Sequence, residues 1–338
     1  MPKIRGDFKK ILLILIGRLG DYIITTAFHR SIRTRFAEAK IIFLTSEKSE
    51  YLAQKSKYFN KVLTLRNWLN PANIRFLFLG RENYDMTIDL NPSYSRTSMA
   101  LVKLSGAPLR ISFKKRAPRG TYTHMIWHDS ENEHFLDKYA NLASFFNADY
   151  EPKLEISIDE KAEKDAEKII AALNINADLP LVFIHPGNFK KKNNRWPEEK
   201  FVELTKRLSA RHRLNLFYIS GPGEKKIIEK NILSHLPQVK MIPPQKIDTL
   251  GALLKKSNLL ICNNTSTLHL AEAVGARTLS FNSIYNEKCW RPRGENHFTI
   301  ISREWSSCVN ISVEEAFKKF NEIFPLLHLG ALRIRDKG

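Results

Sequence analysis

Short apolar runs alternate with segments of helical spacing along most of this chain. Residues 11–16 form a continuous apolar run that ends at a glycine, and residues 23–36 then carry apolar side chains at helical intervals. Such runs are typical of buried parallel strands that are joined by crossover helices. The other strand-like runs are residues 41–44, 86–90, 181–184, 214–220, 259–262 and 278–281. The sequence therefore predicts an α/β protein built on parallel sheets.

The pattern is interrupted near the middle of the chain. Residues 110–119 are a basic stretch that contains a proline, and residues 159–173 predict a charged helix before the strands resume. A length of 338 residues suits about two domains. We expect an N-terminal domain over residues 1–155 and a C-terminal domain over residues 156–312. Ligands of such domains usually lie outside the carboxyl ends of the strands, so the turns after strands are the candidate sites.

The charge balance points to anionic partners. The chain has 54 Lys and Arg against 35 Asp and Glu, a net charge of +19, which favours nucleic acid, phosphorylated molecules or an acidic membrane surface. Cys262, Cys289 and Cys308 are too few for a disulfide framework and form no CxxC pair, so we expect a reducing compartment and no zinc site. The apolar run at residues 11–16 is far shorter than the roughly 20 residues that span a bilayer. We therefore expect a cytoplasmic protein.

The first turn after a strand contains two glycines and a carboxylate. Gly17 and Gly20 allow a sharp turn from strand to helix, and Asp21 lies near the start of that helix. The turn is not G-x-G-x-x-G, so a dinucleotide fingerprint is not indicated. Asp21 can stabilise the helix dipole or act as a general base toward a substrate hydroxyl. The residues alone favour neither interpretation.

The second turn is strongly basic. The sequence HPGN is followed by FKKKNNRWP, which lies between a buried strand and a helix. Lysine binds phosphate as a point charge and arginine binds it bidentately. For any single lysine a solvated loop is the better interpretation, whereas the cluster as a whole favours phosphate binding. The candidate residues are Gly187, Asn188, Lys191, Lys192, Asn194 and Arg195.

Two further turns carry polar groups at the starts of helices. Glu224, in the turn SGPGE, can cap the following helix or accept hydrogen bonds from a ribose. Asn264, Thr265 and Ser266 bring small side chains and free amide N–H groups to a helix N-terminus, which is a ready anion site. His269 follows about one turn later. Taken alone it is best interpreted as a packed histidine, although it could also be a diphosphate ligand.

These four turns, in this order, resemble glycosyltransferase family 9, the family of the ADP-heptose:lipopolysaccharide heptosyltransferases. The resembling motifs are LGD with TTAFHRSIR, HPG with RWPEEKFVEL, SGPGE, and NNTSTLHLAEAVGA, and the resemblance covers about residues 10–294. The resemblance implies a GT-B fold, in which two Rossmann-like domains with parallel sheets face each other across a cleft. The first domain would bind the acceptor and the second the nucleotide-sugar. It also implies that the C-terminal helical segment, residues 313–338, packs back on the first domain. From the residues, we expect its helix to run to about residue 324, where Pro325 ends or kinks it.

The resemblance also assigns roles to residues. It places the catalytic base at Asp21 and the phosphate loop at residues 187–195. The family's acidic-Thr-Gly-x-x-His element falls on Asn264, Thr265, Ser266 and His269. Asn264 replaces the acidic residue and Ser266 the glycine, while Asn194 stands where the family usually has a lysine. Because Asn264 lacks the negative charge, a non-catalytic nucleotide-sugar binder of the same fold is also possible.

The function that the resemblance implies is inverting sugar transfer without a protein nucleophile. The expected donor is ADP-heptose, and the expected acceptor is a lipid-linked, acidic or phosphorylated saccharide of the lipopolysaccharide-core type. No cofactor or metal is expected. The basic surplus, densest at residues 114–119, suits the anionic inner face of the cytoplasmic membrane, where each nearby Lys or Arg contributes about 1 kcal/mol.

Two different functions are also compatible with the sequence. A nucleic-acid-binding protein would use the charge of +19, with Trp68, Arg66 and Arg75 placed to stack on bases. No recognised nucleic-acid motif is present, so a specific nucleic acid is not expected. A GT-B epimerase would act on the donor without any acceptor.

Overall fold

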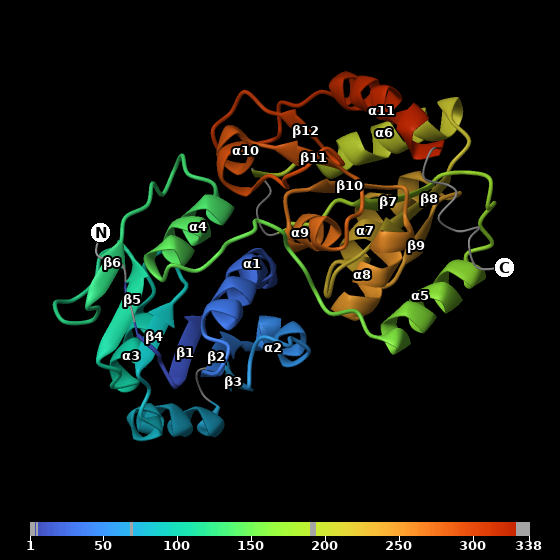
Figure 1. Ribbon diagram of the computed structural model, residues 1–338. Helices are drawn as coiled ribbons and strands as arrows, with labels where there is room; N and C mark the ends of the chain where they lie inside the picture. The colour runs from blue at the N-terminus through green and yellow to red at the C-terminus, as the bar shows by residue number, and fades with distance from the viewer. Residues whose placement is uncertain (1–3, 5, 68–69, 190–193, 329–338) are drawn as a thin grey trace. The chain divides into compact units, whose positions relative to one another are not determined.

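The computed structural model divides the chain into two compact units, Met1–Ser157 and Ile158–Gly338. The expected domain boundary, between residues 155 and 156, lies two residues before this division. Each unit is built on one six-stranded sheet of parallel strands. The predicted α/β class with parallel sheets is therefore confirmed. The structure describes residues 4, 6–67, 70–189 and 194–328 (Figure 1).

The first unit has the strand order β3-β2-β1-β4-β5-β6. Its strands are β1 (Lys10–Leu15), β2 (Lys40–Ser46), β3 (Lys61–Leu65), β4 (Met86–Asp89), β5 (Leu109–Phe113) and β6 (His124–Ile126). Its helices are α1 (Leu19–Arg35), α2 (Glu47–Gln54), the 3₁₀ helix η1 (Pro71–Glu82), α3 (Arg96–Leu104) and α4 (Phe135–Phe145).

Helices cover both faces of this sheet. Leu12 and Ile14 of β1 pack with η1 and α3, through residues such as Phe76 and Leu101. Successive side chains of a strand point to opposite faces, so the buried Leu13 faces the other layer. That layer contains α1 and α4, which contact each other (Figure 1). Burial on both faces explains why β1 is apolar throughout.

The second unit repeats this topology with the strand order β12-β11-β10-β7-β8-β9. Its strands are β7 (Leu181–His185), β8 (Asn215–Ile219), β9 (Lys240–Ile242), β10 (Leu259–Asn263), β11 (Thr278–Asn282) and β12 (His297–Ile301). Its helices are α5 (Glu160–Ala172), α6 (Glu198–Arg211), α7 (Lys225–Asn231), the 3₁₀ turn η3 (Leu233–His235), α8 (Ile247–Lys256), α9 (Ser266–Ala273), α10 (Ile284–Trp290) and α11 (Val313–His328).

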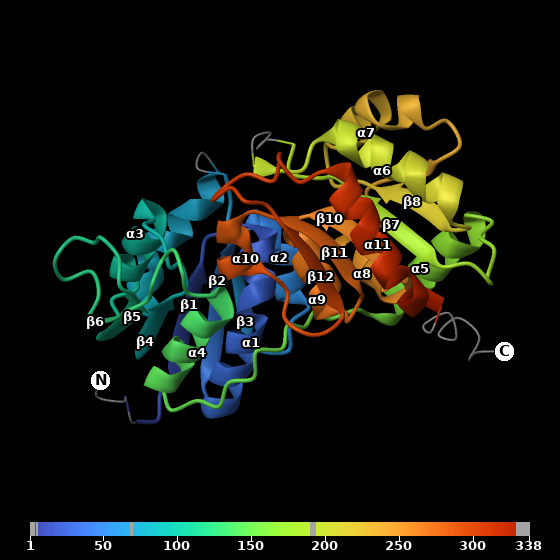
Figure 2. The same cartoon turned by 90° about the horizontal axis from the view of Figure 1, so that it is seen from above.

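The last helix, α11, belongs to the core of the second unit. Its residues Phe320 and Leu327 pack in one cluster with Ile184 of β7, and α11 lies beside α6 (Figure 2). Of the two expectations for Pro325, that it ends the helix is wrong, because α11 continues to His328; a kink stays a prediction. Pro325 is on the exposed side, where water can satisfy the carbonyl that its missing N–H leaves unpaired. The expected packing of this segment on the first domain stays a prediction.

The sequence pattern missed the outer strands β3, β5, β6, β9 and β12. These strands are partly exposed and carry polar or basic residues, so they lack the continuous apolar run of a central strand. The basic stretch at residues 110–119 in fact begins inside β5. Among the described residues, no helix combines the length and the apolar character needed to cross a bilayer.

Candidate functional site

The two sheets share a topology that creates one switch point in each. The chain runs outward from β1 through β2 to β3 and then returns to place β4 on the other side of β1. The second unit does the same around β7 and β10. Loops that leave the carboxyl ends of such strand pairs diverge and leave a crevice for a ligand. Asp21 follows β1, at the switch point of the first unit. Thr265 follows β10, at the switch point of the second unit.

Asp21 is the third residue of α1, and its carboxylate closes the turn after β1. Its Oδ2 accepts a hydrogen bond of 2.7 Å from the backbone N–H of Arg18. A Cβ on Gly17 would lie 2.8 Å from this same oxygen, which explains the glycine at this position. The side chain is partly exposed, and no other hydrogen bond to it is formed by the described residues. The structure thus shows the helix-start role and leaves Oδ1 available for a substrate hydroxyl.

A buried network that the sequence did not predict lies at the end of β4, the strand that pairs with β1. Asp89 is fully buried and forms an ion pair of 2.8 Å with Lys115. Tyr122 donates a hydrogen bond of 2.6 Å to the same carboxylate oxygen, and Ser98 donates a short one. Burial lowers the pKa of Lys115, and the charge of Asp89 opposes this effect. The network fixes the ends of β4 and β5.

This network corrects the expectation that residues 114–119 present their charges together. The Lys115 side chain is only 4% exposed and is neutralised by Asp89. Lys114, Arg116 and Arg119 remain accessible to solvent. Two exposed aromatic residues, Tyr94 and Trp127, follow β4 and β6 at the same edge of the sheet. Neither residue was predicted as a site residue, because Tyr94 lies five residues after β4 and the strand that precedes Trp127 was itself not predicted.

In the second unit, His185 joins three of the four predicted turns. Its Nε2 lies 2.9 Å from Oε2 of Glu224, and its Nδ1 lies 3.5 Å from Oγ1 of Thr265. His185 is the last residue of β7 and is 5% exposed. The turns after β7, β8 and β10 therefore meet at one histidine. His185 was not predicted as a site residue, although a histidine between a buried strand and Pro-Gly was a visible signal.

Glu224 closes its own turn as well as binding His185. Its Oε2 accepts a hydrogen bond of 2.7 Å from the N–H of Gly221. Burial alone would raise the pKa of Glu224, but the hydrogen bond and charge of His185, the Gly221 N–H and the charge of Arg195 together hold it below its ordinary value. Glu224 is therefore ionised at neutral pH.

Gly187 and Asn188 shape the turn after β7. A Cβ on Gly187 would lie 2.5 Å from Cε1 of His185, so only glycine fits beside that ring. Asn188 has a φ of 63°, the left-handed region that asparagine tolerates better than most residues. Both residues thus let the chain turn closely around His185.

Arg195 is internal rather than solvent-facing. Its side chain is 2% exposed, forms an ion pair with Glu198 at the start of α6, and stacks over the ring of Phe189 with 4.8 Å between Cζ and the ring centre. Its Nε and Nη1 are buried and have no hydrogen-bond partner in the part of the chain that the structure describes. Phosphate binding by Arg195 stays a prediction, and these two nitrogens are the donors left for it.

The turn after β10 holds the neighbouring turns in place. Asn263 accepts a hydrogen bond of 2.8 Å from the N–H of Trp196 and donates one of 2.7 Å to the carbonyl of Pro186. Asn264 donates one of 3.1 Å to Asn282, so its amide is engaged within the unit. These contacts place the amides of Thr265 and Ser266, at the start of α9, beside the turn after β7.

His269 matches the packed interpretation. It is 3% exposed, and its Nδ1 lies 3.9 Å from Glu272 of the same helix and has no hydrogen-bond partner among the described residues. Diphosphate binding by His269 stays a prediction. Lys190, Lys191 and Lys192, which carry most of the predicted phosphate-binding charge, lie outside the described residues, as does Trp68. Asn194 is partly exposed. Residues 6–67, 70–189 and 194–328 contain no group of three His, Cys, Asp or Glu side chains placed to hold a metal.

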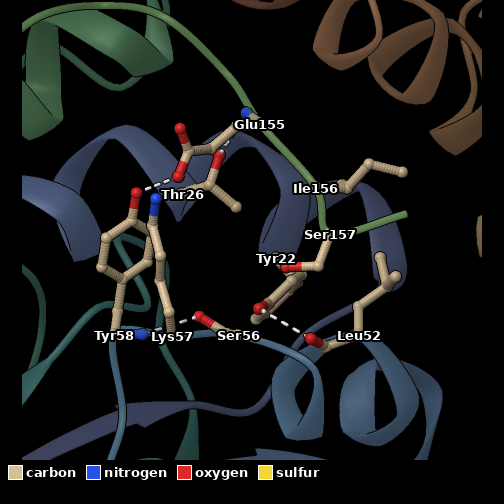
Figure 3. A pocket seen from close by; sticks show the side chains of 9 residues that line it. All are labelled: Tyr22, Thr26, Leu52, Ser56, Lys57, Tyr58, Glu155, Ile156 and Ser157. Atoms are coloured by element: carbon tan, nitrogen blue, oxygen red, sulfur yellow. Dashed lines mark hydrogen bonds between the residues drawn. The ribbon is translucent and has the colours of Figure 1, made fainter. Parts of the chain in front are cut away.

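The first unit has a separate cavity of about 160 Å³, which none of the predicted site residues lines. Figure 3 shows the side chains around it. The cavity is lined by Tyr22, Thr26, Leu52, Ser56, Lys57, Tyr58, Glu155, Ile156 and Ser157. Tyr58 donates a short hydrogen bond to Glu155, Arg30 forms an ion pair of 3.2 Å with it, and Thr26 accepts a bond of 3.1 Å from its N–H. These contacts fasten the end of the first unit to α1.

Comparison with known proteins gives a consistent family and fold. The family model for glycosyltransferase family 9 (heptosyltransferase) matches residues 77–319. The chain is 18% identical to a glycosyltransferase family 9 structure from Veillonella parvula, with a TM-score of 0.79 over 96% of this chain and 98% of that one. It is 15% identical to the E. coli ADP-heptose lps heptosyltransferase II, with a TM-score of 0.74 over 95% and 98%. A third structure, the E. coli heptosyltransferase WaaC with ADP, is 14% identical, with a TM-score of 0.65 over 95% and 99%. No curated protein matches the sequence.

Proposed function

The chain belongs to glycosyltransferase family 9 and has the GT-B fold, and from this premise we propose that it transfers a sugar, with inversion, from a nucleotide-sugar to an anionic saccharide. The observation that carries the proposal is the junction at His185. There the turns after β7, β8 and β10 converge at the switch point of the second unit, which is where an α/β sheet of this kind binds nucleotides.

The donor proposed is ADP-heptose. One of the structures similar to this chain is of a heptosyltransferase with ADP. The backbone N–H groups of Thr265 and Ser266, at the positive end of α9, would bind the diphosphate. Nε–H and Nη1 of Arg195, which have no hydrogen-bond partner among the described residues, would bind it as well. Lys191 and Lys192 would add charge. Glu224, held ionised, would accept hydrogen bonds from the ribose.

Asp21 is proposed as the general base. Its carboxylate removes the proton from an acceptor hydroxyl, the oxygen then bonds to the anomeric carbon, and the nucleotide diphosphate leaves with the electron pair of the broken C–O bond. Attack from the face opposite the leaving group inverts that carbon. Donors aimed at the diphosphate stabilise its growing charge. The proposed reaction uses no protein nucleophile, cofactor or metal.

The acceptor proposed is lipid-linked and acidic or phosphorylated, at the inner face of the cytoplasmic membrane. The net charge of +19 supports it, as do the solvent-accessible Lys114, Arg116 and Arg119 near the carboxyl edge of the first sheet. Tyr94 and Trp127, 52% and 59% exposed at the same edge, offer flat surfaces on which sugar rings can stack.

Calorimetric titration with ADP, ADP-heptose, UDP and single-stranded RNA tests the donor assignment. We expect the adenine nucleotides to bind and the RNA to bind only at low salt, because non-specific RNA binding is screened. A transfer assay that measures ADP release with and without a lipopolysaccharide-core acceptor then separates three functions. Release that depends on the acceptor supports the proposal. Binding without release, with the donor recovered unchanged, would show the non-catalytic binder that Asn264 and Ser266 allow. A donor recovered with an isomerised sugar would show an epimerase, and ADP release without acceptor would show a hydrolase.

A further inference from the structure

The 3₁₀ helix η1 carries an apolar surface that the fold does not use. In a 3₁₀ helix the side chains at positions i and i+3 lie in line. One row, which includes Phe76 and Leu79, is buried against the sheet at 4% and 3% exposure. The next row contains Ile74 and Leu77, which are 64% and 61% exposed. Two large aliphatic side chains thus point outward from the same short element.

The third row of η1 combines an aromatic ring with cations. Phe78 is 47% exposed, and the guanidinium of Arg81 lies over its ring, with 4.5 Å between Cζ and the ring centre. Arg75 lies in the same row, but its guanidinium is engaged within the unit: it donates a hydrogen bond of 2.8 Å to the carbonyl of Thr64 and lies over the ring of Phe76. We call Ile74, Leu77 and Phe78 the apolar ridge. Exposed apolar side chains bordered by arginines are the pattern of segments that lie in the interface of an anionic bilayer.

We propose that the apolar ridge of η1 inserts into the headgroup region of an anionic membrane, with Arg81 against the lipid phosphates. This inference rests on the membrane part of the proposed function and names the surface responsible. Charge decides between the possible occupants. A second copy of the chain would bring another net charge of +19 and the same arginines to the interface, which disfavours self-association, whereas an anionic lipid surface is complementary to them.

The binding mode predicts a particular response to salt. Attraction between exposed charges falls as salt screens it, but burial of apolar surface does not. Wild-type protein should therefore sediment with vesicles of phosphatidylcholine and phosphatidylglycerol, and part of this binding should persist at high salt. Vesicles of phosphatidylcholine alone should bind it weakly.

The test replaces the ridge while keeping the side chains that hold η1 to the sheet. The variant Ile74→Ser/Leu77→Ser/Phe78→Ser should reduce partitioning to the mixed vesicles by at least about tenfold and abolish the salt-resistant part. The matched control is Ile301→Ser/Trp305→Ser/Val309→Ser, which removes residues that are 50%, 44% and 38% exposed in the second unit. It should bind vesicles within about twofold of wild type.

Two further measurements make the result decisive. If the ridge is inserted, Phe78→Trp should show more quenching by brominated lipids than wild type, whose five tryptophans give the background. No added quenching in a vesicle-bound protein would overturn the proposal. Equal vesicle binding by wild type and the ridge variant would also overturn the proposal. The ridge would instead be a contact between two copies of the chain if wild type formed a dimer and the ridge variant lost it while its vesicle binding stayed unchanged. ADP affinity, measured in every variant, reports separately on the proposed transferase, whose failure would leave the vesicle result intact.

Discussion

Nε2 of His185 lies 2.9 Å from the carboxylate of Glu224, which joins the turns after β7 and β8. Glu224→Gln keeps the shape of the side chain and removes its charge. The interaction that orients the His185 ring therefore becomes weaker. We expect calorimetry to show ADP affinity reduced about tenfold, or 1.4 kcal/mol. The control is Glu229→Gln, on the exposed side of α7. Unchanged affinity in Glu224→Gln, or an equal loss in both variants, contradicts the assignment.

Gly187 is required by the ring of His185. In Gly187→Ala the new Cβ, 2.5 Å from Cε1, forces the imidazole to move. We expect ADP affinity to fall by about tenfold or more, with a much smaller effect on the melting temperature. Gly80→Ala is the control, because its Cβ would lie at an ordinary 3.4 Å from the carbonyl of Leu104 in the first unit. Normal ADP binding by Gly187→Ala would show that His185 does not organise the site.

The pair of Asp89 and Lys115 predicts strong coupling. Lys115→Met leaves the Asp89 carboxylate buried without its cation, and loss of one partner of a buried pair costs about 3–5 kcal/mol in the free energy of unfolding. The double variant Asp89→Asn/Lys115→Met should recover much of that loss. Chemical denaturation measures the free energy of unfolding of the single and double variants. The control is Lys114→Met, at an exposed position. Additive effects of the two substitutions would mean that the pair is not coupled.

His29 predicts acid sensitivity of the first unit. Both of its ring nitrogens are buried without hydrogen-bond partners in the described structure, and its ring packs against Tyr22, Phe43 and Phe59. Burial lowers its pKa from 6.5 to about 3. As the pH falls, His29 takes up a proton in the unfolded chain before it does so in the folded protein. The contribution of His29 to the free energy of unfolding is therefore fully present above about pH 6.5 and is lost as the pH drops from there toward about 3.

The expected loss from this residue is about 2 kcal/mol between pH 7 and pH 5. His29→Phe should remove that part of the pH dependence of the free energy of unfolding. The exposed His235→Gln is the control and should keep the wild-type dependence. A pH profile unchanged in His29→Phe would rule out His29 as the source.

The central strands could be predicted because burial on both faces makes them continuously apolar, as in β1 and β7. Strands at or next to a sheet edge, such as β5, could not, because they carry partly exposed polar residues such as Arg110. Turn positions could be predicted from strand ends, but not the contacts between turns. Lys115 looks like one more cation in a basic stretch until the fold brings Asp89, far away in sequence, to its ammonium group. His185 gained its role only when β8 and β10 were placed on either side of β7.

Asp21 is the proposed base of glycosyl transfer, and its role can be measured in a single turnover. The transfer rate of Asp21→Asn is compared with wild type and with Asp137→Asn, which removes a first-turn carboxylate from α4 of the same unit. We predict that Asp21→Asn lowers the rate by about 10²–10⁴-fold with unchanged ADP affinity, while Asp137→Asn keeps it. A folded Asp21→Asn variant within about threefold of the wild-type rate, well below the general-base range, would contradict the assignment of Asp21 as the base.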